Sequence, residues 1–330
     1  MHSATLEPLH ILILMPLRDD WDSAAELVRR IDSAVTSRSA GTALSILLVD
    51  DASIQRCRPA HFAFPFRAVA GISVLRLRRN LGHQRAIAVG LAQVSQQPNF
   101  DAVLVMDADG EDTPEGVVQL IDVFVQNGCS KAVFAERSRR SESAVFKIFY
   151  FIYKVVHRAL TGIAVRVGNF SILPAAYLST LSVVSELWNH YAAAVFRSRL
   201  PYTLTPIARG TRISGKSSMN FIALVAHGLS AISVFADVIG VRLLLISLVG
   251  SLLTAFGIAL VIGIRLFTPY AIPGWATYAS GTLVIILIQL ITIASSFTFF
   301  MLFSRNNLGF VPARDFSYFV AEITTVYSNG

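Results

Sequence analysis

The sequence predicts an α/β protein, in which a mostly parallel sheet carries helices on both faces and is followed by a hairpin of two membrane helices. Three observations support this fold class. Strand-like and helix-like segments alternate over the first 165 residues. The strand-like segments are nearly uninterrupted apolar runs, which is typical of parallel strands buried on both faces. Two long uncharged stretches lie near the C-terminus.

Each element of the alternating region is predicted from its apolar periodicity and from the residues at its ends. We expect strands at 10–15, 45–49, 72–77, 102–106 and 131–135. We expect helices at 23–35, about 83–94 and 114–126. Asp112 or Thr113 would cap the last of these helices, and Pro114 would lie in its first turn.

Two stretches, 243–264 and about 276–303, are apolar and long enough for a helix to cross a bilayer core of ~30 Å. The whole chain is also more apolar than an ordinary soluble protein, since 54% of its 330 residues are hydrophobic and 15% are charged. We therefore expect an integral membrane protein that crosses the bilayer twice.

These features divide the chain into a globular domain over 1–219, a juxtamembrane amphipathic helix over 220–240, the membrane hairpin over 241–305 and a tail over 306–330. Residues 143–160 form a second amphipathic pattern, whose basic and aromatic side chains suit a helix in the headgroup plane. For both amphipathic helices, packing against the sheet is the alternative.

The charge distribution predicts that the globular domain and the tail are cytoplasmic. Pro16 and Arg18 end the N-terminal apolar run at once, so we expect no signal peptide. Arg242 precedes the first span and Arg305 follows the second, whereas the connecting loop carries only Arg265, which follows the positive-inside rule. The net charge of +7 suits anionic membrane lipids, and no nucleic-acid-binding motif is visible, so we expect lipid and no nucleic-acid partners.

Two carboxylates, Asp107 and Asp109, follow the strand expected at 102–106. Side chains at i and i+2 of an extended chain point the same way, so the two can close on one hard divalent cation. The phosphates of a nucleotide would fill the remaining coordination sites. The alternative is a solvated turn before the next helix, and both interpretations can hold at once.

Other charged residues also collect where expected strands end, namely Asp19, Asp20, Asp50, Asp51, Arg78, Arg79 and Arg137. Ligands of open α/β sheets bind beyond the carboxyl ends of the strands, so these residues predict a binding site there. Neither G-x-G-x-x-G nor G-x-x-x-x-G-K-[ST] occurs, which argues against an NAD enzyme and a P-loop NTPase.

Three motifs resemble, in order, those of glycosyltransferase family 2: Val49-Asp50-Asp51-Ala52-Ser53, Arg79-Asn80-Leu81-Gly82-His83-Gln84 and Met106-Asp107-Ala108-Asp109. A later motif, Arg209-x-x-Arg212-x-x-Gly215-Lys216-Ser217, precedes two spans and is similar to the branch that makes dolichyl- and undecaprenyl-phosphate sugars. The resemblance covers about residues 10–305. It implies a Rossmann-like GT-A fold over 1–219 and a cytoplasmic catalytic domain at a bacterial inner membrane.

The resemblance implies a metal-dependent, inverting transfer of a sugar from a UDP- or GDP-linked donor to a polyprenyl phosphate. Asp107 and Asp109 would hold Mg²⁺ or Mn²⁺ on the diphosphate. The resemblance leaves open whether Glu111 is a third ligand. Asp50 and Asp51 would contact the base and ribose. Further donor-binding residues are implied at Pro16, Asp19, Asn80, His83 and Gln84.

A phosphate acceptor is already anionic, so the implied reaction needs charge stabilisation more than a strong general base. The cations that would hold phosphate groups are Arg137, Arg209, Arg212 and Lys216, with Ser217 beside the last. Binding of lipid headgroups is the alternative for Arg212 and Lys216. Gly210 and Gly215 would let this loop close over a nucleotide.

Asn169 occupies the catalytic position at which relatives usually carry an aspartate that assists or orients the acceptor. Either the acceptor needs no base, or Glu186 or Asp112 helps, or activity is altered. Two other functions are left open: transfer to a glycerolipid or sphingolipid hydroxyl, and a nucleotide-sugar-binding membrane scaffold that has lost catalysis. Self-association is also left open.

Overall fold

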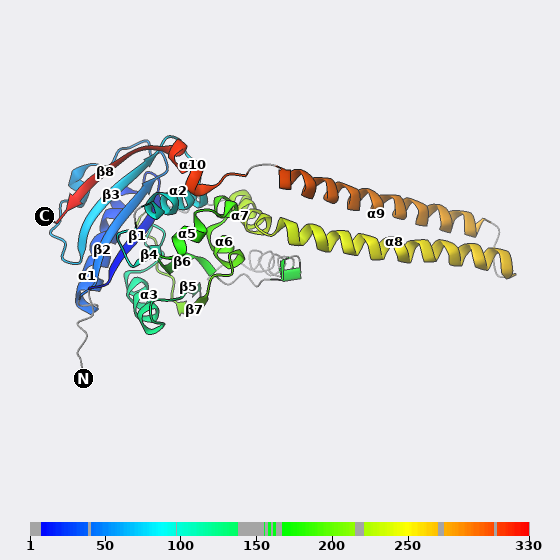
Figure 1. The fold of residues 1–330 in the computed structure, drawn as a ribbon, viewed down its shortest axis with the longest axis horizontal. Helices are drawn as coiled ribbons and strands as arrows, with labels where there is room; N and C mark the ends of the chain where they lie inside the picture. Colours follow the sequence, from blue (N-terminus) through cyan, green and yellow to red (C-terminus); the bar gives the residue numbers. More distant parts are fainter. Residues whose placement is uncertain are drawn as a thin grey trace. The chain divides into compact units, whose positions relative to one another are not determined.

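The computed structural model describes residues 8–38, 41–96, 98–137, 155, 158–159, 161–162, 167–214, 221–269, 274–306 and 309–329 (Figure 1). Two compact units form within the chain. The first comprises residues 1–153, 165–234 and 310–330, and the second comprises 154–164 and 235–309.

One eight-stranded sheet, of order β7-β5-β6-β4-β1-β2-β3-β8, forms the centre of the first unit. Its strands are β1 (His10–Leu17), β2 (Ala43–Asp50), β3 (Val69–Leu77), β4 (Ala102–Val105), β5 (Ala132–Arg137), β6 (Val167–Pro174), β7 (Tyr202–Ile207) and β8 (Val320–Ser328). The pairs β1–β2, β1–β4, β2–β3 and β5–β7 are parallel, whereas β3–β8, β4–β6 and β5–β6 are antiparallel. The sheet is therefore mixed, with a parallel centre.

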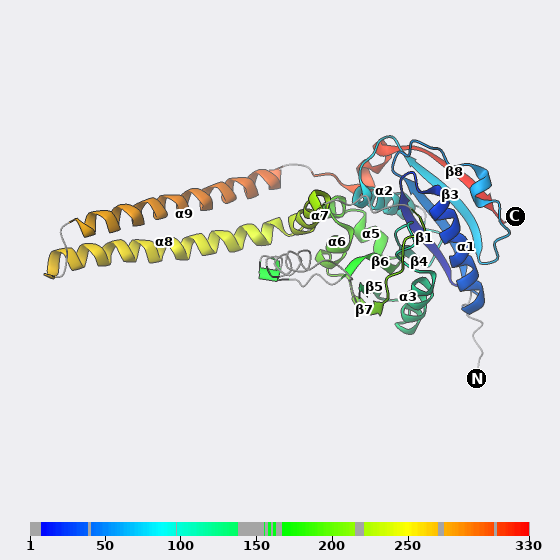
Figure 2. The same cartoon turned by 180° about the vertical axis from the view of Figure 1, so that it is seen from behind.

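Helices cover both faces of this sheet, as the sequence predicts. The helices of the first unit are α1 (Trp21–Arg38), α2 (His83–Ser95), α3 (Pro114–Gln126), α5 (Tyr177–Leu181), α6 (Tyr191–Arg197), α7 (Phe221–Ser233) and α10 (Pro312–Asp315), with 3₁₀ turns η1 (Pro59–Phe62), η2 (Ser185–Trp188) and η3 (Phe316–Phe319). Alternate strand residues face opposite sides: Ile11 and Ile13 pack with α1 and α3, and Leu12 and Leu14 pack with α2, α5 and α6. Figure 2 shows these helices from behind the view of Figure 1. The predicted α/β class is confirmed.

The strands and helices expected over the first 137 residues are all present, with ends that differ by a few residues. The last part of the chain differs more. The segment expected as a tail over 306–330 contains β8, which pairs with β3 and completes the sheet. Its sequence explains this, because Val320, Ile323, Thr324 and other β-branched residues favour a strand.

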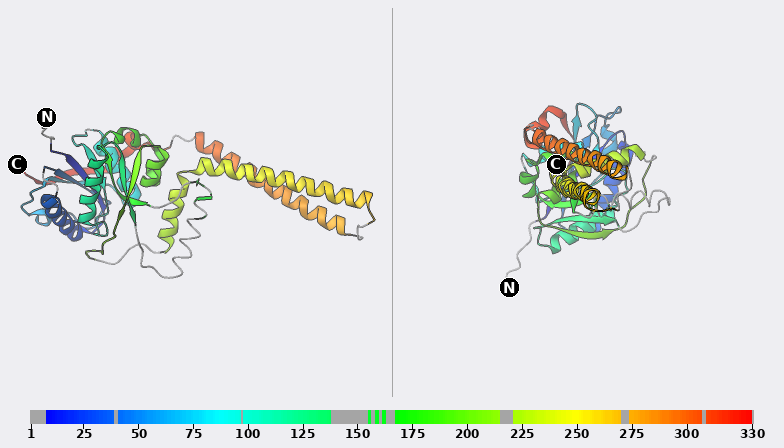
Figure 3. Two further views of the ribbon diagram at one scale, coloured as in Figure 1. Left: turned by 90° about the horizontal axis from the view of Figure 1, so that it is seen from below. Right: turned by 90° about the vertical axis from the view of Figure 1, so that its right-hand side faces the viewer.

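The second unit contains two long helices, α8 (Ala236–Phe267) and α9 (Trp275–Asn306). Both are long and apolar enough to cross a membrane by length and composition. They run side by side (Figure 3), and Cβ atoms added at Gly250 and Gly257 would lie 3.1 and 3.4 Å from side-chain atoms of Leu290 and Leu283. Small residues of this kind let membrane helices approach closely.

The amphipathic helix expected over 220–240 is two elements in the structure, because α7 ends at Ser233 and α8 begins at Ala236. The helix expected over 143–160 lies outside the described residues, apart from residues 155 and 158–159.

A buried carboxylate, Asp32 of α1, holds the first residues of β3 in place. Its Oδ1 atom accepts hydrogen bonds from the backbone N–H groups of Arg67, Ala68 and Val69, at 3.0, 2.8 and 2.9 Å. This contact fixes the chain where it enters β3.

Replacing Asp32 by alanine should lower the free energy of unfolding by about 1–3 kcal/mol, because three backbone donors lose their acceptor. Urea unfolding of the purified full chain measures this, with Asp122→Ala on an exposed turn of α3 as the matched control. Equal stability of the two variants would contradict the structural role of Asp32.

Candidate functional site

The charged residues that follow β1, β2, β3 and β4 meet at one edge of the sheet, where the parallel strands end. Asp107 and Asp109 come directly after β4. Strand β4 ends at Val105, and residues 108–110 form a turn in which Gly110 has a φ of +89°. Thr113 caps α3 by accepting a hydrogen bond from the backbone N–H of Gly116 at 3.1 Å, and Pro114 opens the helix as expected.

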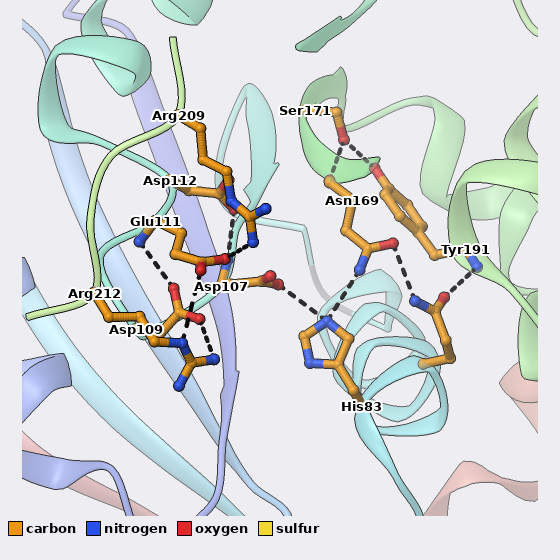
Figure 4. A network of polar contacts seen from close by, with 11 residues as sticks. His83, Asp107, Asp109, Glu111, Asp112, Asn169, Ser171, Tyr191, Arg209 and Arg212 are labelled. Atoms are coloured by element: carbon orange, nitrogen blue, oxygen red, sulfur yellow. Dashed lines mark hydrogen bonds and ion pairs between the residues drawn. The ribbon is translucent and has the colours of Figure 1, made fainter. Parts of the chain in front are cut away.

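The extended-chain argument predicts that the two carboxylates point the same way. Because the chain turns here, they point in different directions (Figure 4). Oδ1 of Asp107 lies 3.0 Å from Nε2 of His83, at the start of α2. Oδ2 of Asp109 accepts a hydrogen bond of 2.7 Å from Nη2 of Arg212. The expected common direction is therefore wrong for this state of the protein.

The loop after β7, residues 208–214, lies directly against the turn after β4. The backbone N–H of Gly210 donates to the carbonyl of Glu111 at 2.8 Å, and that of Ile213 donates to the carbonyl of Asp109 at 3.0 Å. Arg209 donates to the Glu111 carboxylate, and Nε of Arg212 lies 3.7 Å from Oε1 of Glu111. Two arginines of this loop thus neutralise two carboxylates of the turn.

Two glycines make this close approach sterically feasible. A Cβ atom at Gly110 would lie 2.6 Å from Cγ1 of Ile213, and its positive φ also disfavours other residues. A Cβ atom at Gly210 would lie 2.6 Å from Cγ2 of Thr113 and 2.8 Å from the Gly110 carbonyl oxygen. Each segment therefore needs a glycine where it meets the other.

The turn after β4 carries more negative charge than its surroundings favour. Burial raises the pKa of Asp109, and the Asp107 and Glu111 carboxylates raise it further, against the Glu111 backbone N–H and the Arg212 guanidinium. Burial lowers the pKa of Arg209, but its hydrogen bond to Glu111 and the nearby carboxylates give a net increase. Both directions indicate a site that favours additional positive charge.

The residues present fit a divalent cation only together with ligands from another molecule. Carboxylate oxygens are the donors that Mg²⁺ and Mn²⁺ prefer. Among the residues that the structure describes, however, no three His, Cys, Asp or Glu side chains form a group that could hold a metal ion. Glu111 is engaged by Arg209 and lies near Arg212. Asp107 and Asp109 would thus need phosphate oxygens to complete a metal's coordination.

A second polar network, on the α2 side of Asp107, contains the Asn169 position. Nδ2 of Asn169 lies 3.0 Å from Nε2 of His83, and Oδ1 of Asn169 accepts a hydrogen bond of 3.1 Å from Nε2 of Gln84 (Figure 4). Oε1 of Gln84 in turn accepts the backbone N–H of Tyr191 at 2.8 Å. Ser171 donates to the backbone carbonyl of Asn169 and contacts the buried Tyr191 hydroxyl at 2.7 Å.

The Tyr191 backbone N–H fixes the orientation of two side-chain amides, those of Gln84 and Asn169. Because Gln84 must accept through its oxygen, its amide nitrogen faces Asn169, and the amide nitrogen of Asn169 then faces His83. The ring nitrogen Nε2 of His83 cannot accept from Asn169 and donate to Asp107 at the same time. Neutral His83 with its proton on Nδ1 therefore suits Asn169, whereas a proton on Nε2, as in the charged ring, suits Asp107.

Of these two forms, the surroundings favour the protonated one. Burial lowers the pKa of His83, but the carboxylates of Asp107, Asp112 and Asp109 outweigh it, and the net pKa lies above the ordinary value of histidine. The ion pair between His83 and Asp107 therefore stabilises the fold at pH values below the ordinary pKa of histidine. This stabilisation is lost as the pH rises through the raised pKa of His83.

The expected donor-binding residues after β2 and β3 hold the loops of this edge together. Asp51 accepts the backbone N–H groups of Leu81 and Gly82, at 2.6 and 2.9 Å, and burial raises its pKa against those two hydrogen bonds. Asp50 accepts the backbone N–H of Ser53 at 2.7 Å. Asn80 accepts the N–H of Gly82 at 2.9 Å.

Asp19 and Pro16 come from the end of β1. Asp19 accepts the backbone N–H groups of Ile54 and Gln55, at 2.7 and 3.0 Å, so it joins the loop after β1 to the loop after β2. Pro16 is buried within β1, opposite Val49 of β2.

The structure describes little of three other expected residues, Arg137, Lys216 and Ser217. Arg137 is the last residue of β5, opposite Ile207 of β7. Lys216 and Ser217 lie outside the described residues. Glu186, considered as a base, forms an ion pair of 2.8 Å with Arg197.

Asp112, the other carboxylate considered as a base, accepts the backbone N–H of Asp107 at 3.0 Å. Tyr191 and its contact with Ser171 were not predicted from the sequence, because β6 and α6 were not expected.

Comparison with known proteins points to one family. Residues 13–173 match the sequence model of glycosyl transferase family 2. Undecaprenyl-phosphate 4-deoxy-4-formamido-L-arabinose transferase from Erwinia tasmaniensis is 26% identical over 78% of this chain and 77% of its own length. The protein of the same name from Pseudomonas paraeruginosa is 31% identical over 41% of this chain and 37% of its own length.

Solved structures are more distant. Glucosyl-3-phosphoglycerate synthase from Mycobacterium tuberculosis superimposes with a TM-score of 0.48 at 14% identity, over 70% of this chain and 80% of that chain. A likeness at this level carries no argument about the site.

Replacing Arg212 by glutamine should raise the affinity of the nucleotide-free protein for Mn²⁺ by roughly three- to tenfold, because Asp109 loses a competing cation that lies 2.7 Å away. Titration followed by the electron paramagnetic resonance of free Mn²⁺ measures this affinity, with Arg67→Gln on the exposed surface as control. Unchanged or weaker binding in the Arg212 variant would show that the two cations do not compete.

Replacing Asn169 by aspartate should raise the pKa of His83 further, because a carboxylate then lies beside Nε2 and stabilises the charged ring. Titration of the histidine C2–H resonances by NMR measures this pKa, and His83→Gln identifies the resonance. A pKa that stays the same or falls would contradict the described contact between Asn169 and His83.

Proposed function

Since residues 13–173 make this chain a glycosyltransferase of family 2, we propose that it transfers a sugar from a nucleoside-diphosphate donor to a polyprenyl phosphate. The relatives at 26% identity are named for transfer to undecaprenyl phosphate. The observation that carries the proposal is the pairing of Asp109 with Arg212 and of Glu111 with Arg209, where the parallel strands of the sheet end. Such pairs can exchange partners when a metal–diphosphate arrives.

In this proposal Asp107 and Asp109 hold Mg²⁺ or Mn²⁺ together with the donor diphosphate. The bound metal would supply charge neutralisation on the departing diphosphate. Arg212 and Arg209 are released from their carboxylates and hold phosphate oxygens, for which the guanidinium fork is well suited. The two arginines of the 208–214 loop would then pair with the phosphates of the substrates and no longer with Glu111 and Asp109.

The acceptor side needs no carboxylate base in this scheme. A phosphate monoester is already anionic and attacks the anomeric carbon directly, with inversion. Asn169, oriented by Gln84 and Tyr191, keeps an amide N–H next to His83 without adding negative charge near the acceptor. A neutral residue at this position therefore suits a phosphate acceptor.

The same observations disfavour a lipid hydroxyl as acceptor, because that reaction would need a free base. Glu186 is paired with Arg197, and Asp112 is used by the backbone of Asp107. A scaffold without catalysis is disfavoured by the retained Asp107 and Asp109.

We place the reaction at the cytoplasmic face of the inner membrane, with α8 and α9 as the two spans. Their length and apolar composition support this assignment. The charges that flank them, Arg242 and Arg305 against Arg265, support a cytoplasmic catalytic unit. A polyprenyl phosphate would then stay in the bilayer while its headgroup reaches the site.

The direct test incubates the purified full chain with Mn²⁺, undecaprenyl phosphate and a panel of radiolabelled UDP- and GDP-sugars. We expect label in the lipid extract with at least one donor, and no such product without a divalent metal. A preparation that binds nucleotide and yields no lipid product with any donor would refute the proposal.

Replacing Asp109 by alanine should lower the transfer rate at least a hundredfold, about 3 kcal/mol in the barrier, because the metal loses a charged ligand. The melting temperature should stay close to that of the wild type, since Asp109 holds a surface loop and no core element. Asp122→Ala serves as the control. Substantial turnover by the Asp109 variant would exclude its role in metal binding.

A further inference from the structure

Three aromatic side chains meet in the first unit, where the chain continues after the apolar helices. This aromatic platform is defined here as Trp188 of η2, Phe310, and Phe319 of η3. The ring centroid of Trp188 lies 3.8 Å from that of Phe310 and 5.1 Å from that of Phe319. Trp188 and Phe319 pack against the core on the α2 side of the sheet, and all three side chains are partly exposed. The platform is therefore a fixed surface that solvent and ligands can reach.

Two arginines lie over the rings of this platform. Cζ of Arg85 is 5.1 Å from the ring centroid of Trp188, and Cζ of Arg79 is 5.9 Å from that of Phe319. Both distances are within the range of a cation–π contact, about 6 Å. Both arginines are exposed. Within the part of the chain that the structure describes, neither guanidinium group makes a hydrogen bond or an ion pair.

Stacking on a ring leaves the hydrogen-bonding capacity of a guanidinium group unused. The ring contacts the face of the group, whereas the N–H donors lie in its plane and point outward. A planar fork of donors held in this way suits bidentate binding of a phosphate or carboxylate. Because an exposed cation–π contact adds little to stability, two such arginines without carboxylate partners indicate an anion site.

The covalent chain keeps the platform close to the end of α9. Only residues 307–309 separate Asn306, the last residue of α9, from Phe310. Because an extended chain advances at most about 3.6 Å per residue, Phe310 lies within roughly 15 Å of the end of that helix. With α9 as a membrane span, as proposed above, the platform is held near the membrane surface.

Arg85 points away from the site where the sugar would be transferred. His83, whose ring lies 3.0 Å from Asp107, is two positions earlier on α2. Each residue of an α-helix turns by about 100°, so side chains two positions apart point about 200° apart. An anion held by Arg85 is therefore distinct from the diphosphate and the acceptor phosphate of the proposed reaction.

We propose that Arg79 and Arg85, on the aromatic platform, bind the headgroup phosphate of an anionic phospholipid from the surrounding bilayer. The guanidinium groups donate to the phosphate oxygens, and the rings hold the guanidinium groups in place. The contact joins the start of α2, which carries His83, to the membrane surface. This inference rests on the proposed function, because it needs α9 as a membrane span.

The observations favour a lipid over an acidic protein as the occupant. The net charge of the chain is +7, and headgroups are the most abundant anions at an inner-membrane surface. Tyr318, next to Phe319 in η3, is 75% exposed. Exposed aromatic side chains are typical of the headgroup level in membrane proteins.

Native mass spectrometry of the full chain in detergent, titrated with dioleoyl phosphatidylglycerol or dioleoyl phosphatidylcholine, tests the inference. We expect phosphatidylglycerol to bind about tenfold more tightly, because each arginine at an anionic surface contributes a factor of about five. Arg79→Gln combined with Arg85→Gln should weaken phosphatidylglycerol binding at least fivefold and leave phosphatidylcholine binding unchanged. The control, Arg38→Gln with Arg67→Gln at two other exposed arginines, should bind both lipids as the wild type does.

Lysine at both positions separates a built site from general attraction between charges. Arg79→Lys with Arg85→Lys keeps both charges but loses the planar fork, so phosphatidylglycerol binding should weaken at least threefold. Binding equal to that of the wild type would show that only net charge matters. The melting temperature shows whether each variant is folded, and Arg85→Gln alone replaces a double variant that is not.

Fluorescence quenching tests whether lipid headgroups reach the platform. Trp21→Phe with Trp275→Phe leaves Trp188 as the only tryptophan of the chain. In lipid nanodiscs, phosphatidylcholine that is spin-labelled on its headgroup should quench Trp188 more strongly than lipid that is labelled at the end of an acyl chain. Trp188 fluorescence that neither lipid quenches would overturn the inference.

Equal affinity for the two lipids, or equal losses in the Gln variant and its control, would also overturn the inference. Displacement of phosphatidylglycerol by equimolar undecaprenyl phosphate would assign the platform to the acceptor, and displacement by polyglutamate would assign it to an acidic protein. The outcome is separate from that of the proposed function. Lipid-linked sugar product without a preference for phosphatidylglycerol would refute only the platform site, and an arginine-dependent preference without product would refute only the proposed transfer.

Discussion

The concentration of negative charge after β4 is the constraint on which the rest of the site depends. Asp107, Asp109 and Glu111 lie close together at a partly buried turn, where burial and mutual repulsion raise the pKa of Asp109. The protein balances this charge with Arg209, Arg212 and the ring of His83. The loop over 208–214 and the start of α2 are therefore held at the site by the same charge that would attract a metal.

In the proposed function, this charge balance couples the binding of the metal to the binding of the diphosphate. Without substrates, the arginines neutralise the carboxylates and the loop is closed onto the turn. In the proposed function, a divalent cation would compete for the same oxygens and a diphosphate for the same guanidinium groups, so each substrate component would release a partner for the other. The proposed acceptor is also an anion, which is consistent with a neutral amide at Asn169 in place of another carboxylate.

Local signals made the fold class and the position of the Asp107–Asp109 pair predictable from the sequence. The end of β4, the Thr113 cap and Pro114 lie within a few residues of the Asp-x-Asp pair, and the strand–helix alternation set the fold class. The side-chain directions of Asp107 and Asp109 were predicted wrongly, because the chain turns at residues 108–110. That one turn gives the two carboxylates different partners.

Long-range pairing was not predictable from one sequence. β8 joins β3 from the other end of the chain, so its only local signal is a run of β-branched residues in what looked like a tail. Asn169 takes its orientation from Gln84 on α2 and from the backbone of Tyr191 on α6, and nothing in the motif around Asn169 specifies these neighbours. Such contacts depend on how the elements pack in three dimensions.

The exchange of cations at Asp109 is tested most directly by crystallography of the full chain with Mn²⁺ and a nucleoside diphosphate. The anomalous scattering of manganese locates the ion without ambiguity. We predict manganese at bonding distance from the Asp109 carboxylate and the diphosphate, with Arg212 moved from Asp109 onto phosphate oxygens. Manganese bound elsewhere, or Arg212 still hydrogen-bonded to Asp109 with the nucleotide in place, would contradict the account.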